Sequence, residues 1–328
     1  MGVLNLSFKA CKLSLLAALF FASPKEAIAA SIYQFSSFDY PGKTETAASD
    51  INNLGQIVGT YGDGASGFLY DGKDFTSFKP PASGEVFIPG INDNGQIVGG
   101  YFDLEDIPRG FIKEGDKYIT INFPNDPPSA ETALSGINDK GIAVGYYFDP
   151  SYTTSYAFSL DTKTNAYNQI NIPLSGDRAY AWGINNLNQI VGSYRNTEGQ
   201  VGYIYDKGNV TKLQFPGSSL TAAYGINDSG KVVGSFFRPE TDRKLYAFAW
   251  QNGVFEELKY PGATGTFASA VDNSGKIVGY YFDSTGAKHA FIATPVPDKS
   301  AGYCVLAFTL VSAVVVRKKK LKALTQNI

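Results

Sequence analysis

Hydrophobic and polar positions repeat along the chain with a period of roughly 44 residues. Each copy has a small residue, Ile or Val, Asn or Asp, turn residues, two apolar residues, Gly and, one residue later, an aromatic. The six copies are 50–61 (DINNLGQIVGTY), 90–101 (GINDNGQIVGGY), 136–147 (GINDKGIAVGYY), 183–194 (GINNLNQIVGSY), 225–236 (GINDSGKVVGSF) and 270–281 (AVDNSGKIVGYY). β-rich units of this length are typical of propeller blades.

Each unit is predicted to hold four short strands. Asn-Asp-x-Gly supplies the left-handed backbone that a tight turn needs, so strand one ends at Ile-Asn and strand two is Gln-Ile-Val-Gly-x-Tyr. Strand three carries a small residue followed by an aromatic. Strand four alternates polar and apolar residues and ends at proline, as in 118–124 (YITINFP), because proline cannot donate to a ladder.

The strands are offset against the units at the two ends of the repeat region. Residues 33–41 (YQFSSFDYP) read as a strand four without a preceding unit, and the sixth unit stops after its strand three at 291–293. A closed ring needs this offset, because the N-terminal strand then completes the last blade and leaves only short edges. The sequence therefore predicts an all-β, six-bladed β-propeller of four-stranded blades over residues 31–294.

Both ends of the chain have targeting patterns. In 1–30, Lys9 and Lys12 precede an apolar run and small residues, which predicts a cleaved signal peptide. After a linker at 295–300, residues 301–316 are uncharged and 317–328 are basic, which favours a transmembrane helix with a cytoplasmic tail. The alternative is a buried core helix with a solvated basic end. We expect an exported protein, extracellular or in the cell envelope, with a single-pass anchor or a processed C-terminus.

The near-neutral charge of the whole chain comes from its ends. The chain has 28 basic and 30 acidic residues, of which nine basic and one acidic lie in 1–30 and 299–328. The remaining 19 basic and 29 acidic residues give residues 31–298, the repeat region with part of the linker, a net charge of −10. This argues against nucleic acid as a partner. We expect a monomer whose membrane contact is the C-terminal helix.

A triplet in strand three connects the repeats to a known family. His289-Ala290-Phe291 follows the sixth GINDxGQIVGxY-like segment, with near matches YAF at 156–158 and 246–248. This pattern resembles the HAF-repeat family of extracellular repeat proteins, which implies export and a repeat fold but no reaction. Residues 294–300 (TPVPDKS) resemble a PEP-CTERM sorting signal, although Asp298 and Lys299 replace the usual Glu and Pro.

Few residues offer catalytic or metal chemistry. Cys11 and Cys304 lie in the terminal segments, and the single His289 excludes sites that need two imidazoles. Turn chemistry accounts for the Asn and Asp residues of the repeats without calcium, because they supply too few carboxylates for a cage. We therefore expect no metal and no cofactor.

The candidate ligand-binding residues follow strand two. Tyr-Phe-Asp recurs there and Arg238 has a related position, so one mouth of the ring would combine aromatics with carboxylates. The residues are Tyr101, Phe102, Asp103, Tyr147, Phe148, Asp149, Arg238, Tyr281, Phe282 and Asp283. Alternatively, the aromatics pack between blades and the aspartates start turns. We expect a surface module that binds glycans or envelope proteins; the alternative is a polysaccharide hydrolase or lyase that uses carboxylates at this mouth.

Overall fold

The computed structural model describes residues 33–296, except 63, 65, 81–83, 125–130, 174–175, 198 and 240–243. The chain divides into two compact units, Met1–Ser31 and Ile32–Ile328, and all described residues belong to the second. The expected signal peptide (1–30), transmembrane helix (301–316) and basic tail (317–328) lie outside the described residues. Within the described part, no helix is long and apolar enough to cross a membrane.

The described residues contain 24 β-strands, which pair antiparallel in six sets of four that we call blades 1 to 6. Blade 1 has β2 (Thr46–Ile51), β3 (Ile57–Tyr61), β4 (Ser66–Tyr70) and β5 (Phe75–Phe78). Blade 2 has β6 (Val86–Ile91), β7 (Ile97–Phe102), β8 (Pro108–Glu114) and β9 (Lys117–Ile121). Blade 3 has β10 (Thr132–Ile137), β11 (Ile142–Phe148), β12 (Ser155–Asp161) and β13 (Ala166–Gln169).

The second half of the described chain repeats this plan. Blade 4 has β14 (Arg178–Ile184), β15 (Ile190–Asn196), β16 (Gly199–Asp206) and β17 (Asn209–Leu213). Blade 5 has β18 (Leu220–Ile226), β19 (Val232–Phe237), β20 (Leu245–Gln251) and β21 (Val254–Leu258). Blade 6 has β22 (Gly265–Val271), β23 (Ile277–Phe282), β24 (Lys288–Pro295) and the N-terminal β1 (Tyr33–Phe38).

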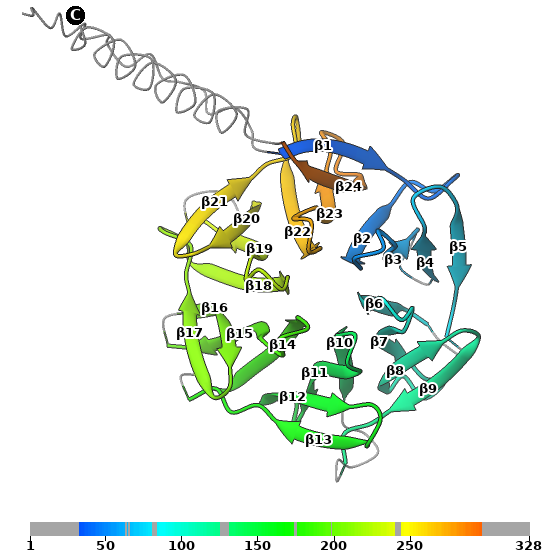
Figure 1. Cartoon of the computed structure of the whole chain (residues 1–328), viewed down its shortest axis with the longest axis vertical. Coiled ribbons are helices and arrows are strands. Elements are labelled where there is room, and N and C mark those ends of the chain that lie inside the picture. The colour runs from blue at the N-terminus through cyan, green and yellow to red at the C-terminus, as the bar shows by residue number, and fades with distance from the viewer. Residues whose placement is uncertain are drawn as a thin grey trace, which may run out of the picture. The chain divides into compact units, whose positions relative to one another are not determined.

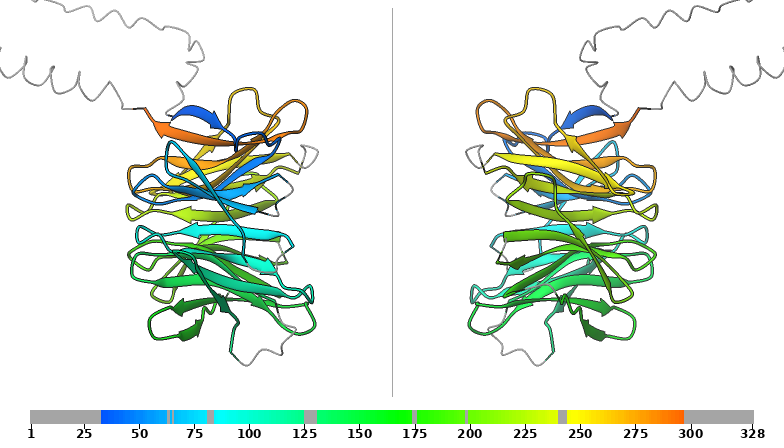
Figure 2. Two further views of the ribbon diagram at one scale, coloured as in Figure 1. Left: turned by 90° about the vertical axis from the view of Figure 1, so that its right-hand side faces the viewer. Right: turned by 90° about the vertical axis from the view of Figure 1, so that its left-hand side faces the viewer.

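The blades surround a central axis, and the first strand of each lies innermost (Figure 1). β1 pairs with β24 from Tyr33↔Pro295 to Phe38↔Ala290, so strands from the two ends of the described chain share one sheet. The prediction of an all-β propeller fold is confirmed. In the side views of Figure 2 the strands run from one face of the ring to the other. We call the face with the turns between first and second strands the turn face, and the opposite face the loop face.

The Asn of each unit shapes the turn between the first and second strands. In blade 1 the Asn52 side-chain oxygen accepts the N–H groups of Leu54 and Gln56, at 3.1 and 2.9 Å. The Gly55 N–H closes the turn on the Asn52 carbonyl, with φ of 81°. Asn188 takes this left-handed position in blade 4 with φ of 63°, which asparagine tolerates better than most residues.

The glycine of strand two is required by a close approach inside the blade. A Cβ at Gly59 would overlap the carbonyl oxygen of Ala47 on the neighbouring strand and the ring of Phe68. Phe68 is fully buried. The equivalent aromatics in the other blades are also fully buried: Phe111, Phe158, Tyr203, Phe248 and Phe291. The aromatic of the strand-three triplet is therefore the centre of each blade's core.

The strand-four prediction was too long at its C-terminal end. β9 stops at Ile121, three residues before Pro124, and Phe123 leaves the sheet. The Phe123 ring stacks on Tyr147 of the next blade, with centroids 3.9 Å apart. The same step follows β1, β17 and β21, where Tyr40, Phe215 and Tyr260 stack on the next blade at 3.7 Å. The aromatic-Pro pairs that we assigned to the ends of strands are contacts between blades.

Candidate functional site

The three Tyr-Phe-Asp segments reach the loop face at the ends of β7, β11 and β23, but their aspartates serve the local backbone. The Asp103 Oδ1 atom accepts the N–H groups of Glu105 and Ile107, both at 2.9 Å. Asp149 and Asp283 accept pairs of backbone N–H groups in the same way. Each aspartate therefore starts a turn, as the alternative interpretation expected.

The tyrosines and phenylalanines of these segments point to different surroundings. Tyr147 and Tyr281 stack on the aromatics that end the previous blade, whereas the Tyr101 hydroxyl lies 3.0 Å from the Thr120 hydroxyl. Phe102 is half-buried at the end of β7. Phe148 and Phe282 instead contact aromatics near the ring axis, which are described below.

Arg238 is satisfied within its own blade. Its Nη2 atom donates to Glu257 at 2.7 Å, and the guanidinium carbon lies 4.7 Å from the centroid of the Tyr246 ring. This ion pair is half-exposed, which limits its contribution to stability. The ten predicted residues therefore share the loop face without converging on one pocket.

His289 lies between two carboxylates on the loop face. Its Nδ1 atom is 2.9 Å from Asp39 and its Nε2 atom is 3.5 Å from Asp283. Burial lowers the pKa of His289, but hydrogen bonds and charge from both aspartates outweigh it and leave the pKa raised. The Thr285 hydroxyl and two backbone N–H groups lower the pKa of Asp283 to about 2, with a smaller contribution from His289. Within blade 6, the imidazole therefore links Asp39, which follows β1, to Asp283, which follows β23, and this contact is strongest when His289 is protonated.

The largest set of converging polar groups lies on the axis instead. The buried asparagines of blades 1 to 5 each donate Nδ2–H to the main-chain carbonyl of the equivalent residue in the next blade, at 2.9–3.1 Å. The donors are Asn52, Asn92, Asn138, Asn185 and Asn227, and the last acceptor is Asp272. The Asp272 side chain has no N–H group to donate to blade 1. We call these six residues the asparagine ring.

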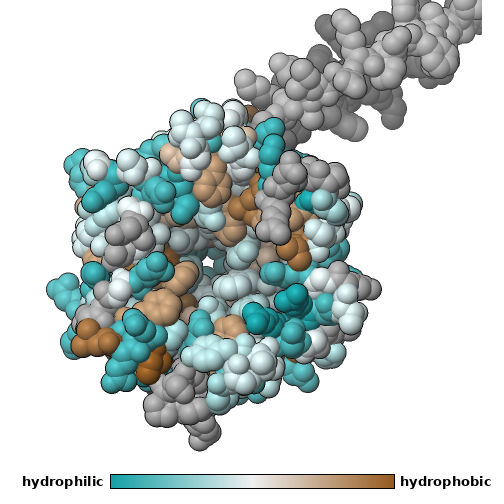
Figure 3. All heavy atoms as spheres, turned by 180° about the vertical axis from the view of Figure 1, so that it is seen from behind, coloured by the Kyte–Doolittle hydropathy of each residue, from teal (hydrophilic) through white to brown (hydrophobic). Residues whose placement is uncertain are grey.

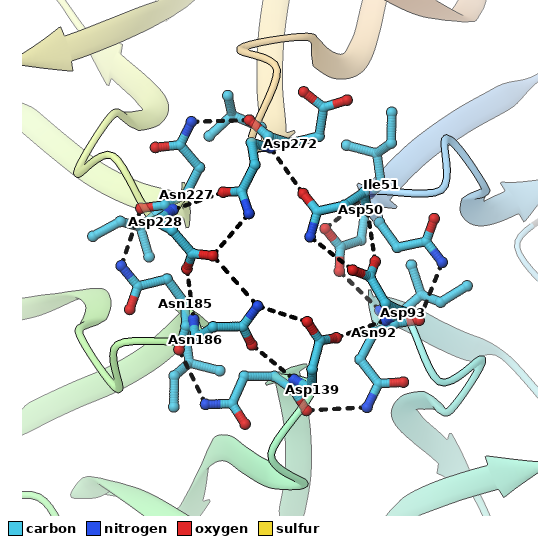
Figure 4. Close-up of a pocket in the computed structure, with 18 of the residues that line it drawn as sticks. Asp50, Ile51, Asn92, Asp93, Asp139, Asn185, Asn186, Asn227, Asp228 and Asp272 are labelled. Atoms are coloured by element: carbon cyan, nitrogen blue, oxygen red, sulfur yellow. Dashed lines mark hydrogen bonds between the residues drawn. The ribbon is translucent and has the colours of Figure 1, made fainter.

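The residues that follow the asparagine ring form a second, closed circle. Each donates its main-chain N–H to the side-chain oxygen of its equivalent in the next blade, at 2.7–2.9 Å. The circle runs through Asn53, Asp93, Asp139, Asn186, Asp228 and Asn273, and the last bond returns to Asn53 (Figure 4). Every blade is therefore tied to the next one at the turn face.

The three aspartates of this second circle are distributed around the axis, and each accepts a hydrogen bond from a neighbouring asparagine amide. Asn53 Nδ2 donates to Asp93 at 2.9 Å, Asn186 Nδ2 donates to Asp139 at 2.6 Å, and Asn273 Nδ2 donates to Asp228 at 2.7 Å. Within the described residues, no group of three His, Cys, Asp or Glu side chains is arranged to hold a metal ion. The arrangement therefore presents amide and carboxylate groups that are already hydrogen-bonded to one another.

A narrow axial channel continues inward from these circles. Two adjoining cavities share Asp50, Ile137, Ile184, Ile226 and Val271, and one of them lies at the asparagine ring. Asp50 occupies the position that holds Gly in blades 2 to 5 and Ala in blade 6. Its two oxygens accept the N–H groups of Ile51 and Ile91, each at 2.8 Å. Burial, partly offset by these two bonds, raises the pKa of Asp50 to about 7.

Towards the loop face, the wall around the axis becomes aromatic. Trp182 and Tyr224 line the inner cavity, three residues before the asparagines of blades 4 and 5. They belong to a run of rings from blade 3 to blade 6 in which successive centroids lie 4.6–5.9 Å apart. This aromatic mouth consists of Phe148, Tyr146, Tyr180, Trp182, Tyr224, Phe267, Tyr280 and Phe282.

The aromatic mouth keeps part of its surface in contact with solvent. Except for Phe148, its members are half-buried. Burial raises the pKa values of Tyr146, Tyr224 and Tyr280, so these hydroxyls remain neutral hydrogen-bonding groups at physiological pH. Figure 3 shows the axial opening on one face of the ring, with pale residues at its rim and hydrophobic residues in separate patches around it. The mouth thus combines ring faces with hydroxyls.

The sequence interpretation missed most of the aromatic mouth because strand one was treated as a stretch of small residues. Trp182 and Tyr224 stand where the other units have Ser49, Pro89, Ser135 and Ser269. When the six units are aligned at their asparagines, Trp182 and Tyr224 are the two aromatic residues at a position where the other units have serine or proline. This position faces the axis. The same alignment reveals Asp50 in a column of glycines.

Comparison with known proteins supports the fold. No family model and no curated protein matches the chain. The chain is similar to a protein assigned as TolB from Agrobacterium tumefaciens, with a TM-score of 0.52, 10% identity, and coverage of 77% of this chain and 91% of that one. The six-bladed fucose-recognising lectin of Aleuria aurantia has a TM-score of 0.47 at 12% identity, over 80% and 100% of the two chains. At these identities the likeness shows a propeller fold alone.

Proposed function

We propose that the chain is an exported glycan-binding module, built as a closed six-bladed propeller and held in the cell envelope or released from it. The observation that carries the proposal is the aromatic mouth, an unbroken run of eight rings around the axis of which seven are half-buried. A monomeric propeller needs buried aromatics in its blades. It does not need half-exposed ones around its axis.

Sugar rings match the chemistry of this surface. Their C–H faces pack on aromatic rings, and their hydroxyl groups bond to nearby polar groups. The Trp182 and Tyr180 rings stack on each other at 5.2 Å, which holds both in one orientation before a ligand arrives. Little side-chain entropy is then lost on binding. The second candidate ligand is an envelope protein whose exposed apolar residues would pack on the same aromatic rings.

The carboxylates favour binding over hydrolysis. Retaining and inverting glycosidases need two carboxyl groups about 5–9.5 Å apart beside the scissile bond. Asp93, Asp139 and Asp228 lie around the axis, and each already accepts hydrogen bonds from neighbouring blades, which occupy oxygens that a nucleophile or general base would use. The geometry therefore favours a module that holds a saccharide without cleaving it.

The glycan proposal is tested by screening the full chain on a glycan array and by variants of the mouth. We expect Trp182→Ala and Tyr224→Ala each to weaken binding of an array hit by tenfold or more, since stacking on each ring would be lost. Tyr118→Leu on the outermost strand β9 is the matched control and should bind as the parent does. Unchanged binding by both mouth variants, or cleavage of the bound glycan, would refute the proposal.

Export and anchoring belong to the same proposal and have their own test. The support is the pattern of residues 1–30 and 301–328 together with the resemblance to HAF-repeat and PEP-CTERM sequences. Mass spectrometry of the protein recovered from envelope and culture fractions should find a chain that begins near residue 30. A cytoplasmic chain that retains residues 1–30 would contradict this part of the proposal.

A further inference from the structure

Two arginines face each other on neighbouring strands of blade 4, and neither has an acidic partner among the described residues. Arg178 on β14 is directly opposite Arg195 on β15, and Arg195 is opposite Gln200 on β16. Opposed residues in antiparallel strands have Cβ atoms about 4.5–5.5 Å apart, where like charges are destabilising. In the described part of the chain, neither guanidinium forms an ion pair or donates a hydrogen bond, and the buried Nε of Arg178 has no partner.

The two guanidinium groups border a pocket on the loop face between blades 4 and 5. The pocket is lined by Tyr180, Tyr194, Gln200 and Leu220 as well as by the two arginines. The Arg178 guanidinium lies over the Phe148 ring, and the guanidinium carbon is 5.6 Å from the ring centroid. Phe148 and Tyr180 belong to the aromatic mouth, so the pocket adjoins that surface.

The other lining groups narrow the choice of ligand. Gln200 donates its Nε2–H to the Ser193 hydroxyl at 3.0 Å, which leaves its Oε1 as an acceptor for a ligand hydroxyl. Tyr180 and Leu220 supply apolar sides. Guanidinium groups bind carboxylates through paired, charge-assisted hydrogen bonds. A carboxylate next to a ring hydroxyl, on a ring with apolar faces, is the chemistry of a hexuronic acid.

We propose that this pocket, Arg178 with Arg195, binds the carboxylate of an acidic sugar within a glycan held at the aromatic mouth. This inference rests on the proposed glycan binding and specifies the class of glycan, one that contains an acidic sugar. Residues 31–298 carry a net charge of −10, so long-range electrostatics do not attract an anion. Selection for a carboxylate then comes from the two arginines alone.

The test is calorimetric titration of the full chain with trigalacturonic acid and with its methyl ester, which has the same rings without charge. We expect the acid to bind at least tenfold more tightly than the ester. Arg178→Gln combined with Arg195→Gln should remove this difference, whereas Lys117→Gln on the exposed end of β9 should keep it. Arg195→Lys retains the charge and should keep part of the preference, which separates recognition of the ligand from damage to the fold.

The outcomes separate this inference from the proposed function. Equal binding of acid and ester, with continued dependence on Trp182 and Tyr224, overturns the arginine pocket and leaves glycan binding intact. Failure of every saccharide to bind overturns both. Arginine-dependent binding of a hexaglutamate peptide, with no response to trigalacturonic acid, overturns the sugar assignment in favour of an acidic peptide.

Discussion

Asp272 interrupts the asparagine ring, and its replacement by asparagine should stabilise the protein. Asn52 is the next residue of the ring. Among the described residues, its carbonyl accepts only the Gly55 N–H, whereas its equivalents also accept an Nδ2–H from the previous blade. Asp272 Oδ1 already accepts the N–H of Lys276 at 2.8 Å, as the asparagines do in their own turns. Asp272→Asn therefore keeps the turn and supplies the missing donor.

The magnitude follows from one additional buried hydrogen bond. A typical intramolecular hydrogen bond contributes about 0.5–1.5 kcal/mol net. Asp272 is 6% exposed, so the new bond would form away from water. For domains of about 150–250 residues, about 1 kcal/mol corresponds to a rise in Tm of about 2–4 °C. We expect Asp272→Asn to fall in this range.

Asn185→Asp is the reciprocal change. It removes the donors to the Asn227 carbonyl at 3.0 Å and to Gln189 Oε1 at 2.8 Å, and it places carboxylate oxygen against both acceptors. We expect a loss of about 2–4 kcal/mol, since two hydrogen bonds disappear and a carboxylate oxygen faces both acceptors, although the Asn227 carbonyl keeps the Gly230 N–H.

Differential scanning calorimetry at pH 7 of both variants and the parent measures these effects. Asp116→Asn, in the exposed turn between β8 and β9, controls for the loss of one negative charge and should change Tm by less than 1 °C. The reasoning fails if Asp272→Asn lowers Tm, or if Asn185→Asp is tolerated without loss, because the asparagine ring would then not hold the blades together.

Three further predictions concern the core and pH. Phe158→Ala empties the fully buried centre of blade 3 and should cost about 3–5 kcal/mol in urea unfolding; a cost below about 1 kcal/mol would contradict the assigned core. Burial raises the pKa of Asp50 to about 7, so its contribution to folding stability is greatest below about pH 4 and falls as pH rises to 7; Asp50→Asn should flatten this part of the pH–stability curve. Burial lowers the pKa of His289, but Asp39 and Asp283 raise it by more. His289 therefore stabilises the fold below about pH 6.5, and this effect is lost as pH rises through its folded pKa. NMR titration of this single imidazole should give a midpoint above about 6.5, and a lower midpoint would show that the two contacts are absent in solution.

The positions of most strands could be predicted from the sequence because the turns between them are set by residues that are close together in the chain. Asn52 and Gly55 dictate a turn through contacts within five residues, and Gly59 is required by the strand beside it. Comparison of the six copies also predicted that residues 33–41 form a strand four without the other three strands of a unit before it. In the structure, β1 pairs with β24 from Tyr33↔Pro295 to Phe38↔Ala290.

The candidate site was less accessible because its geometry depends on contacts between blades. Asp103 and Asp283 looked available in the sequence, yet their oxygens are used by N–H groups two to four residues away. Trp182 looked like one more strand residue, and only the arrangement of the blades places it beside Tyr224. The opposed pair Arg178 and Arg195 needs the exact register of β14 and β15.

The position of β24 also has a mechanical consequence. β24 lies between β1 and β23 and is antiparallel to both, with six residue pairs on each side. A force applied beyond Pro295 would pull β24 along its own axis and load both ladders in shear, so many hydrogen bonds would have to break together. Had the N-terminal strand paired elsewhere, β24 would be an edge strand held on one side. The N-terminal strand therefore acts as a clamp on the last strand before the C-terminal segment.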